Sequence, residues 1–149
     1  MKAVVVGPGA GRFIPVGTSG TGVTIKVSGA ESGELCTVWE GRVPPGAVGA
    51  GPHYHRGRDE FFYVLDGELV LRIGDESHVA KAGSFAFEPR ETIHGFHNAS
   101  SNSATILVMH HPAGFERFLD EMQALAARNG SKEERAALAA QFDMIPVPS

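Results

Sequence analysis

Turn-forming residues recur about every eight to twelve positions through most of this chain, and this spacing limits the fold more than any other feature. Gly-Pro, Asp-Gly and Asn-rich clusters separate short segments that are rich in Val, Ile, Phe and Thr. The segments alternate apolar and polar residues, which is typical of half-buried strands. We therefore predict an all-β sandwich or barrel. The predicted strands are Val23–Val27, Leu35–Val43, Glu60–Leu65, Glu68–Ile73, Ser77–Ala80, Ser84–Phe87, Thr92–Asn98 and Ala104–His110.

The pattern changes near the C-terminus. Apolar residues recur at three- and four-residue spacing over Phe115–Leu125, which predicts an amphipathic helix that ends at Asn129-Gly130. Ser131 is followed three residues later by Glu134, which is the pattern of a capping box. A second short helix is therefore predicted to continue to Gln141.

Length and composition favour one domain. A chain of 149 residues is long enough for a single core, and no linker divides it. We expect one domain over residues 1–149, with a core barrel at about 23–111, a helical segment at about 113–141 and an extended tail beyond.

The charge and the cysteine count exclude several kinds of partner and site. The 13 Lys and Arg residues stand against 17 Asp and Glu residues, a formal net charge of −4, without a basic run. This argues against nucleic acid and against an anionic membrane as partners. Cys36 is the single cysteine, which excludes an internal disulfide and a cysteine-based zinc site. Because no apolar stretch is long enough to span a bilayer, we expect a cytoplasmic protein.

The dipeptide Asp66-Gly67 separates two β-rich runs and is the sequence that a two-residue type I′ turn prefers. It predicts a hairpin in which Glu60 opposes Ile73. One face of that hairpin is an apolar stripe directed at the core, formed by Phe62, Val64, Leu69, Leu71 and Ile73. Glu60 ends the stripe, where an ionised carboxylate is costly unless it is paired, hydrogen-bonded or bound to a metal.

The opposite face of the same hairpin is also largely apolar. It contains Phe61, Tyr63, Leu65, Val70 and Arg72. We expect the N-terminal segment or a second subunit to cover this face, and we expect a homodimer.

Histidines near Glu60 offer it a partner. His53 and His55 are two residues apart, so in an extended segment both imidazoles project to the same side. His94 follows later, and strand alternation places it on the same side as Phe96. Three neutral imidazoles and one carboxylate could hold a divalent cation, which would remove the cost of burying Glu60. The alternative is that these are ordinary core histidines.

Two spaced patterns resemble the motifs of a known family. The first is His53-x-His55-x4-Glu60-x6-Gly67, and the second is Gly83-x5-Pro89-x4-His94-x3-Asn98. The sequence thereby resembles a small single-domain cupin of the quercetin-dioxygenase-like type. The resemblance implies a double-stranded β-helix, or jelly-roll barrel, with His53, His55, Glu60 and His94 as the ligands of one divalent transition metal: Fe, Mn, Ni, Co, Cu or Zn. Two glycines of the family's pattern are replaced, by Ala47 and Glu91.

The resemblance also implies an enzyme. Four protein ligands on a six-coordinate metal leave two positions for water, substrate or dioxygen, so we expect a dioxygenase that acts on a small aromatic or enolisable oxygen compound. Glu60 would be the catalytic base. Phe62, Phe96 and His110 are the candidates for the substrate pocket, whereas alternation turns His97 to the opposite face.

Two other functions fit the same residues. One is a redox-neutral, metal-dependent isomerase or cyclase, in which Glu60 or His110 moves a proton. The other is a cupin that binds a small ligand without turnover. The sequence assigns no role to His111.

Overall fold

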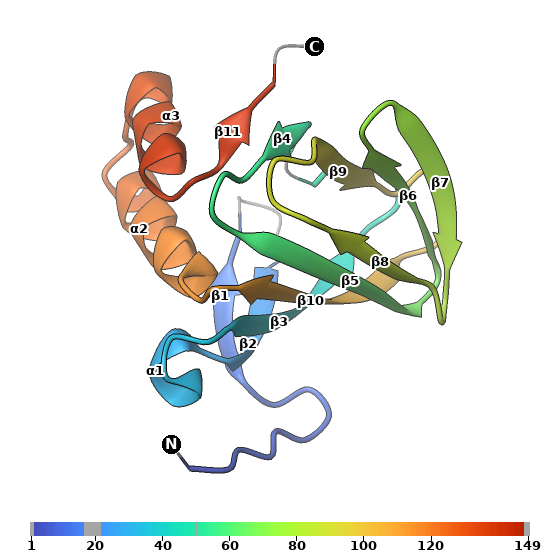
Figure 1. The fold of residues 1–149 in the computed structure, drawn as a ribbon, viewed down its shortest axis with the longest axis horizontal. Helices are drawn as coiled ribbons and strands as arrows, with labels where there is room; N and C mark the ends of the chain where they lie inside the picture. Colours follow the sequence, from blue (N-terminus) through green and yellow to red (C-terminus); the bar gives the residue numbers. More distant parts are fainter. Residues whose placement is uncertain (1, 17–21, 50, 148–149) are drawn as a thin grey trace.

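The computed structural model describes residues 2–16, 22–49 and 51–147, and its strands form two antiparallel sheets (Figure 1). The first sheet has the order β1-β2-β3-β10-β5-β8, with β1 (Arg12–Pro15), β2 (Gly22–Val27), β3 (Thr37–Val43), β10 (Ala104–His111), β5 (Asp59–Asp66) and β8 (Phe85–Glu88). The second has the order β11-β4-β9-β6-β7, with β11 (Ile145–Pro146), β4 (His53–Tyr54), β9 (His94–His97), β6 (Glu68–Ile73) and β7 (Glu76–Lys81).

The hydrophobic core fills the space between the two sheets. Successive side chains of a strand point to opposite faces, and in β10 the burial alternates at every residue. Each sheet therefore presents an apolar inner face to the other. The core includes Ile25, Trp39, Phe62, Val64, Ile106 and Val108 from the first sheet and Leu69, Leu71 and Ala80 from the second. The predicted all-β jelly roll is confirmed, as two facing sheets that, over the described residues, are not joined into one closed barrel.

The predicted hairpin at Asp66-Gly67 is wrong. A type I′ turn needs a positive φ at both residues, but Gly67 has φ +74° while Asp66 continues β5 and pairs with Thr105. The strand β5 lies between β10 and β8 in one sheet, and β6 lies between β9 and β7 in the other. Gly67 therefore carries the chain from one sheet to the other, and the predicted pair Glu60–Ile73 does not form.

The inward face that was deduced from this hairpin is nevertheless observed. The four residues of the apolar stripe nearest the turn are at most 3% exposed: Phe62, Val64, Leu69 and Leu71. Glu60 is 4% exposed. Alternation depends on each strand alone, and both strands face the same core. The predicted direction of these side chains is therefore correct although the predicted pairing of the strands is wrong.

Both predicted C-terminal helices are present. They are α2 (Phe115–Ala127) and α3 (Lys132–Gln141), and Ser131 and Glu134 form the predicted capping box. The helix α2 packs beside the first sheet, where the ring of Phe115 stacks on that of Trp39 at a centroid distance of 5.5 Å (Figure 1).

The start of α2 is held by a buried carboxylate. Glu116 accepts hydrogen bonds from the Gly29 backbone N–H at 2.9 Å and from the Thr37 hydroxyl. Gly29 begins a short helix that the sequence analysis did not predict, α1 (Gly29–Ser32), which has a capping box of its own between Ser28 and Glu31. One buried glutamate thus ties α1, β3 and α2 together.

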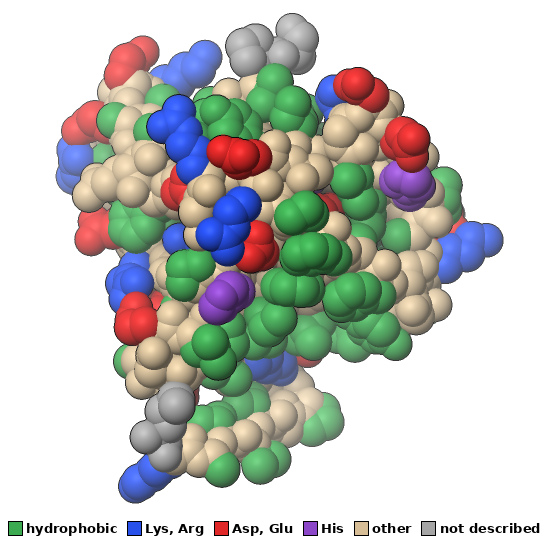
Figure 2. All heavy atoms as spheres, in the orientation of Figure 1, with side chains coloured by type: hydrophobic (Ala, Val, Ile, Leu, Met, Phe, Trp, Pro, Cys, Tyr) green, Lys and Arg blue, Asp and Glu red, His purple; other side chains and the backbone are tan. Residues whose placement is uncertain are grey.

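The predicted second apolar face is divided between the sheets, because Phe61, Tyr63 and Leu65 lie on β5 whereas Val70 and Arg72 lie on β6. The part on the outer face of the first sheet is apolar. Figure 2 shows hydrophobic side chains gathered over β5 and β8, and the exposed ones include Tyr63, Leu65, Phe85 and Phe87. Val6 of the N-terminal segment lines a hollow with Leu65 and Leu107 at one end of this face. The homodimer stays a prediction. Among the described residues, no helix has the length and hydropathy needed to cross a bilayer.

The crossing at Gly67 can be tested by substitution. Gly67 and Gly74 both have a positive φ, +74° and +61°, but a Cβ at Gly67 would lie 2.7 Å from the Ser103 carbonyl oxygen, whereas a Cβ at Gly74 meets nothing within 4 Å. Gly74→Ala should lower the free energy of unfolding by about 1 kcal/mol through backbone strain alone. Gly67→Ala should lower it by a further ~1–3 kcal/mol through the steric clash. Urea denaturation measures both values, and equal losses would show that the crossing is not tightly packed.

Candidate metal centre

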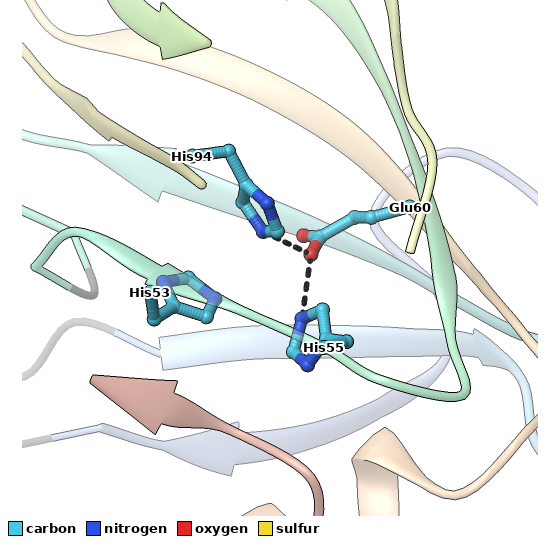
Figure 3. Close-up of side chains that lie close together, drawn as sticks. All are labelled: His53, His55, Glu60 and His94. Atoms are coloured by element: carbon cyan, nitrogen blue, oxygen red, sulfur yellow. Dashed lines mark hydrogen bonds and ion pairs between the residues drawn. The ribbon is translucent and has the colours of Figure 1, made fainter. Parts of the chain in front are cut away.

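Four buried side chains meet between the two sheets. His53 comes from β4 and His94 from β9, and these two residues are directly opposite each other in the second sheet. Glu60 projects from β5 in the first sheet, and His55 follows β4. One donor atom of each residue lies within 4.8 Å of the others (Figure 3). The structure thus brings together the four residues that the sequence analysis selected as ligands.

The link between His55 and Glu60 is a tight bend fastened by the C-terminal tail. The Asp143 carboxylate accepts hydrogen bonds from the backbone N–H groups of Arg56 at 2.9 Å and Gly57 at 2.8 Å. This bend turns the chain from β4 back into β5. His55 and Glu60 therefore approach the same point from two sheets.

Each imidazole is oriented by a backbone carbonyl. The Nδ1 atom of His53 donates to Gly51 O at 2.8 Å, that of His55 to Asp143 O at 2.6 Å, and that of His94 to Thr92 O at 2.9 Å. A carbonyl oxygen can only accept, so Nδ1 carries the proton in all three rings. When such a ring is neutral, its Nε2 atom carries a lone pair, and this is the orientation that backbone carbonyls impose on histidine ligands of metals.

The cluster contains one buried carboxylate, Glu60, and no permanently charged cationic side chain to balance it. Glu60 Oε2 lies 3.2 Å from Nε2 of His55 and 3.1 Å from Nε2 of His94. Burial by itself lowers the pKa of His94, but the hydrogen bond and the charge of Glu60 outweigh it and raise this pKa to about 9. Burial lowers the pKa of His53 to about 4, so this ring is neutral. In the protein without a cation, a proton on His94 neutralises Glu60.

The donor set fits a divalent transition metal. Two ligands on opposite sides of such an ion are about 4.2 Å apart, close to the 4.8 Å spread of the four donor atoms. The set combines three imidazole nitrogens with one carboxylate, which suits Fe, Mn, Co, Ni, Cu and Zn. A cation among these atoms would replace the proton on His94 and pair the buried charge of Glu60.

His110 lies next to the cluster on β10. It is 1% exposed, its Nε2 is 3.6 Å from Glu60 Oε1, and its ring stacks on Phe115 at 4.2 Å. Burial lowers its pKa to about 3, so the ring is neutral. His110 points inward, as alternation indicated, and its place in a substrate pocket stays a prediction.

The other residues that the sequence singled out are not donors of the cluster. Phe62 and Phe96 pack against each other at a centroid distance of 5.5 Å, with Phe62 in the core and Phe96 partly buried. Phe62 comes from β5 in the first sheet and Phe96 from β9 in the second, so their rings meet between the sheets. His97 is exposed on β9, and Nδ1 of His111 donates to Leu35 O at 2.8 Å, so neither belongs to the cluster.

One residue of the site was missed by the sequence analysis. Glu88 is 1% exposed, is the cross-strand partner of Glu60, and has its Oε2 3.6 Å from His94 Nε2. Burial raises the pKa of Glu88 to about 8. The predicted strand stopped at Phe87, one residue short. Continuing the alternation by one residue, inward with Ala86 and outward with Phe87, would have pointed this carboxyl inward.

Together these residues form one polar row across an apolar sheet. In the register of the first sheet, Glu88 on β8 is opposite Glu60 on β5, Glu60 is opposite His110 on β10, and His110 is opposite Thr37 on β3. All four side chains are at most 4% exposed. The site therefore extends beyond the four donors, along a line of polar groups perpendicular to the strands.

The two replaced glycines have different consequences. Glu91 adopts φ +67°, the left-handed conformation that a glycine adopts without strain, and its N–H donates to His55 O at 2.6 Å. At Ala47 the preceding Gly46 takes the positive φ, +71°, instead. The loop after β8 thus places a non-glycine residue, Glu91, in a strained backbone conformation.

The sequence is similar to known proteins over part of its length. The family described as Cupin domain matches residues 39–110. An uncharacterized protein of Aquifex aeolicus (strain VF5) is 35% identical over 57 residues, which is 38% of this chain and 47% of that protein. The match thus spans about half the length of this relative.

Solved structures share the fold. KdgF from Halomonas sp. has a TM-score of 0.65 at 18% identity, over 78% of this chain and 99% of that one. The polyketide cyclase RemF from Streptomyces resistomycificus has a TM-score of 0.63 at 22% identity, over 74% and 80%. A sugar phosphate isomerase of the cupin superfamily from Silicibacter pomeroyi has a TM-score of 0.53 at 32% identity, over 60% and 59%.

Substitution of the donors tests whether they hold a metal. Glu60→Ala and His94→Ala should each reduce the bound metal at least about tenfold, because each variant keeps only three of the four donors. His97→Ala, on the same strand as His94 but exposed, should keep the wild-type content. Elemental analysis of the purified proteins gives the metal per chain. Equal loading in all three variants would contradict the assignment.

Metal binding should also release a proton. Because the pKa of His94 is raised to about 9, this ring holds a proton at about pH 7.5 that a cation must displace from Nε2. Zn(II) added to the metal-free protein should therefore release about one proton per chain. The apparent affinity should fall about tenfold for each pH unit below 9. Calorimetric titration in two buffers of different ionisation enthalpy counts the protons, and a count near zero would mean that His94 is neutral before the metal binds.

Proposed function

This chain belongs to the cupin superfamily, and from that premise we propose that it is a metal-dependent dioxygenase that acts on a small aromatic or enolisable oxygen compound. The observation that carries the proposal is the orientation of the three imidazoles. Their Nδ1 atoms are all engaged by backbone carbonyls, and their Nε2 atoms are directed with Glu60 at one buried point.

The chemistry of the site divides between the cation and the chain. When bound, the metal would take an oxygen of the substrate, make its hydroxyl more acidic and, if it is a redox metal, support the reaction with dioxygen. Glu60 would accept the substrate's hydroxyl proton on a carboxylate oxygen. Neutral His110 lies with its Nε2 3.6 Å from Glu60 Oε1, just beyond hydrogen-bond length, and would have to move closer to share a proton held there. Phe62 and Phe96 would exclude water from the reacting atoms.

A redox-neutral isomerase or cyclase is the second candidate. It is favoured by two buried titratable side chains that are not among the four donors. Glu88 lies beside His94, and His110 lies beside Glu60. Such groups suit a reaction in which a proton is removed from one atom and returned to another. The sugar phosphate isomerase at 32% identity supports this candidate over the part of the chain that it covers, whereas the polyketide cyclase shows the fold alone.

The two candidates differ in their need for oxygen. Protein purified without added metal should contain Fe, Mn, Co, Ni or Cu, and an oxygen electrode should record uptake with a flavonol, a 1,3-diketone or a catechol. Glu60→Gln, reloaded with the same metal, should reduce the initial rate at least about a hundredfold, as expected on removal of a general base. Turnover that persists under argon and with Zn(II) would favour the isomerase or cyclase. Tight binding of these compounds without any turnover would leave a ligand-binding protein.

A further inference from the structure

Glu88 has no hydrogen-bond partner for one of its oxygens. Its residue exposure is 1%, and Oε2 accepts no hydrogen bond from the described residues. Oε2 lies 3.6 Å from Nε2 of His94, which is beyond hydrogen-bond length. A buried polar group without a partner is costly, so such a group in a native protein calls for a missing partner.

The backbone around Glu88 is tied to β5 on both sides of the residue. Glu88 is the last residue of β8, where its backbone is paired with that of Glu60. The loop that follows β8 is held to the start of β5. There Asp59 accepts hydrogen bonds from the backbone N–H and the guanidinium of Arg90, at 2.7 to 3.0 Å. Because ladder and clamp both fix the strand end, the carboxyl of Glu88 is held toward the cluster.

Glu88 is a neighbour of the donor cluster and not a member of it. Among the described residues, the donor atoms that lie within 4.8 Å of one another belong to His53, His55, Glu60 and His94. Those four already supply three nitrogens and one carboxylate. A partner for Glu88 would therefore stand beside the metal and would not be the metal itself.

We propose that Glu88 hydrogen-bonds the second of two adjacent oxygens of the substrate, and that it thereby selects compounds with a hydroxyl next to the oxygen that binds the metal. The substrate class is then narrower than an enolisable oxygen compound: it is a catechol, an enediol or an α-hydroxy ketone. This inference rests on the proposed function for its metal-bound substrate, but it does not depend on whether dioxygen takes part.

The alternative roles of Glu88 fit the observations less well. A purely structural carboxyl would be hydrogen-bonded within the fold, as Glu116 is by Gly29, Thr37 and Gly114. An ion pair with His94 alone would leave Glu60 to compete for the same Nε2, which lies closer to it, at 3.1 Å. A hydroxyl in front of Oε2 satisfies the carboxyl without adding charge to a site that already buries Glu60.

Two probes that differ by one hydroxyl test the inference. Protein loaded with Co(II) is titrated under argon with catechol and with phenol, and the visible absorption of the metal reports binding. The variants are Glu88→Met, which keeps the length of the side chain without its polar end, and Glu88→Gln, which restores hydrogen bonding. Glu76→Gln is the matched control, because its side chain is 79% exposed on β7. The Co(II) content and the thermal stability of each variant are measured alongside.

All variants should fold and load Co(II) like the wild type, since an apolar side chain of equal length in place of an unpartnered carboxyl is not destabilising. The preference for catechol over phenol should fall about tenfold in Glu88→Met, the equivalent of one hydrogen bond. It should be retained in Glu88→Gln and Glu76→Gln, and phenol should bind all four proteins alike.

Three outcomes would overturn the inference. An unchanged preference in Glu88→Met would show that Glu88 does not meet the second oxygen. Loss of Co(II) from Glu88→Met would make Glu88 a ligand instead. Failure of loaded wild-type protein to bind catechol would exclude the substrate class. None of these results requires oxygen uptake, so the inference and the proposed dioxygenase activity fail separately.

Discussion

The burial of one carboxylate, Glu60, is the constraint on which the site depends. Its residue is 4% exposed at the end of an apolar stripe, where a bare negative charge is strongly disfavoured. The surrounding structure offers partners to it: Nε2 atoms of His55 and His94 lie at 3.2 and 3.1 Å, and neutral His110 lies further away, at 3.6 Å. Those imidazoles are in turn fixed by backbone carbonyls. A cation is the simplest way to balance the charge of this arrangement while leaving the imidazoles neutral.

Sequence patterns captured the direction of side chains better than the pairing of strands. Alternation along one strand is a local property, so the inward positions of Phe62, Glu60 and His94 could be predicted. Which strand lies beside which depends on contacts between distant segments. A dipeptide such as Asp66-Gly67 can close a hairpin or cross between sheets, and its sequence does not distinguish the two. The elements that were missed, such as β4 and α1, are too short to have a period, although the Ser28–Glu31 capping box was a usable signal.

Much of the support for the site comes from outside the segment that matches the family. The match ends at residue 110, yet Asp143 orients His55 through its carbonyl and fastens the bend after it through its carboxylate. The strand β11 pairs with β4, with Pro146 opposite His53. Family motifs identify donors, but they carry no information on these distant supports. Relatives with a different C-terminal segment would have to position the same imidazoles by other means.

The division of the donors between the sheets has a consequence for how the protein comes apart. His53 and His94 belong to one sheet and Glu60 to the other, and within the described residues the two sheets form separate hydrogen-bonded ladders. A cation held by all of them would act as a cross-link between two layers that otherwise adhere mainly through apolar contacts and a few hydrogen bonds of Glu60. Such a link exists only when both layers are assembled, so it would oppose their separation without speeding their first encounter. The metal would then set the lifetime of the folded state as well as its chemistry.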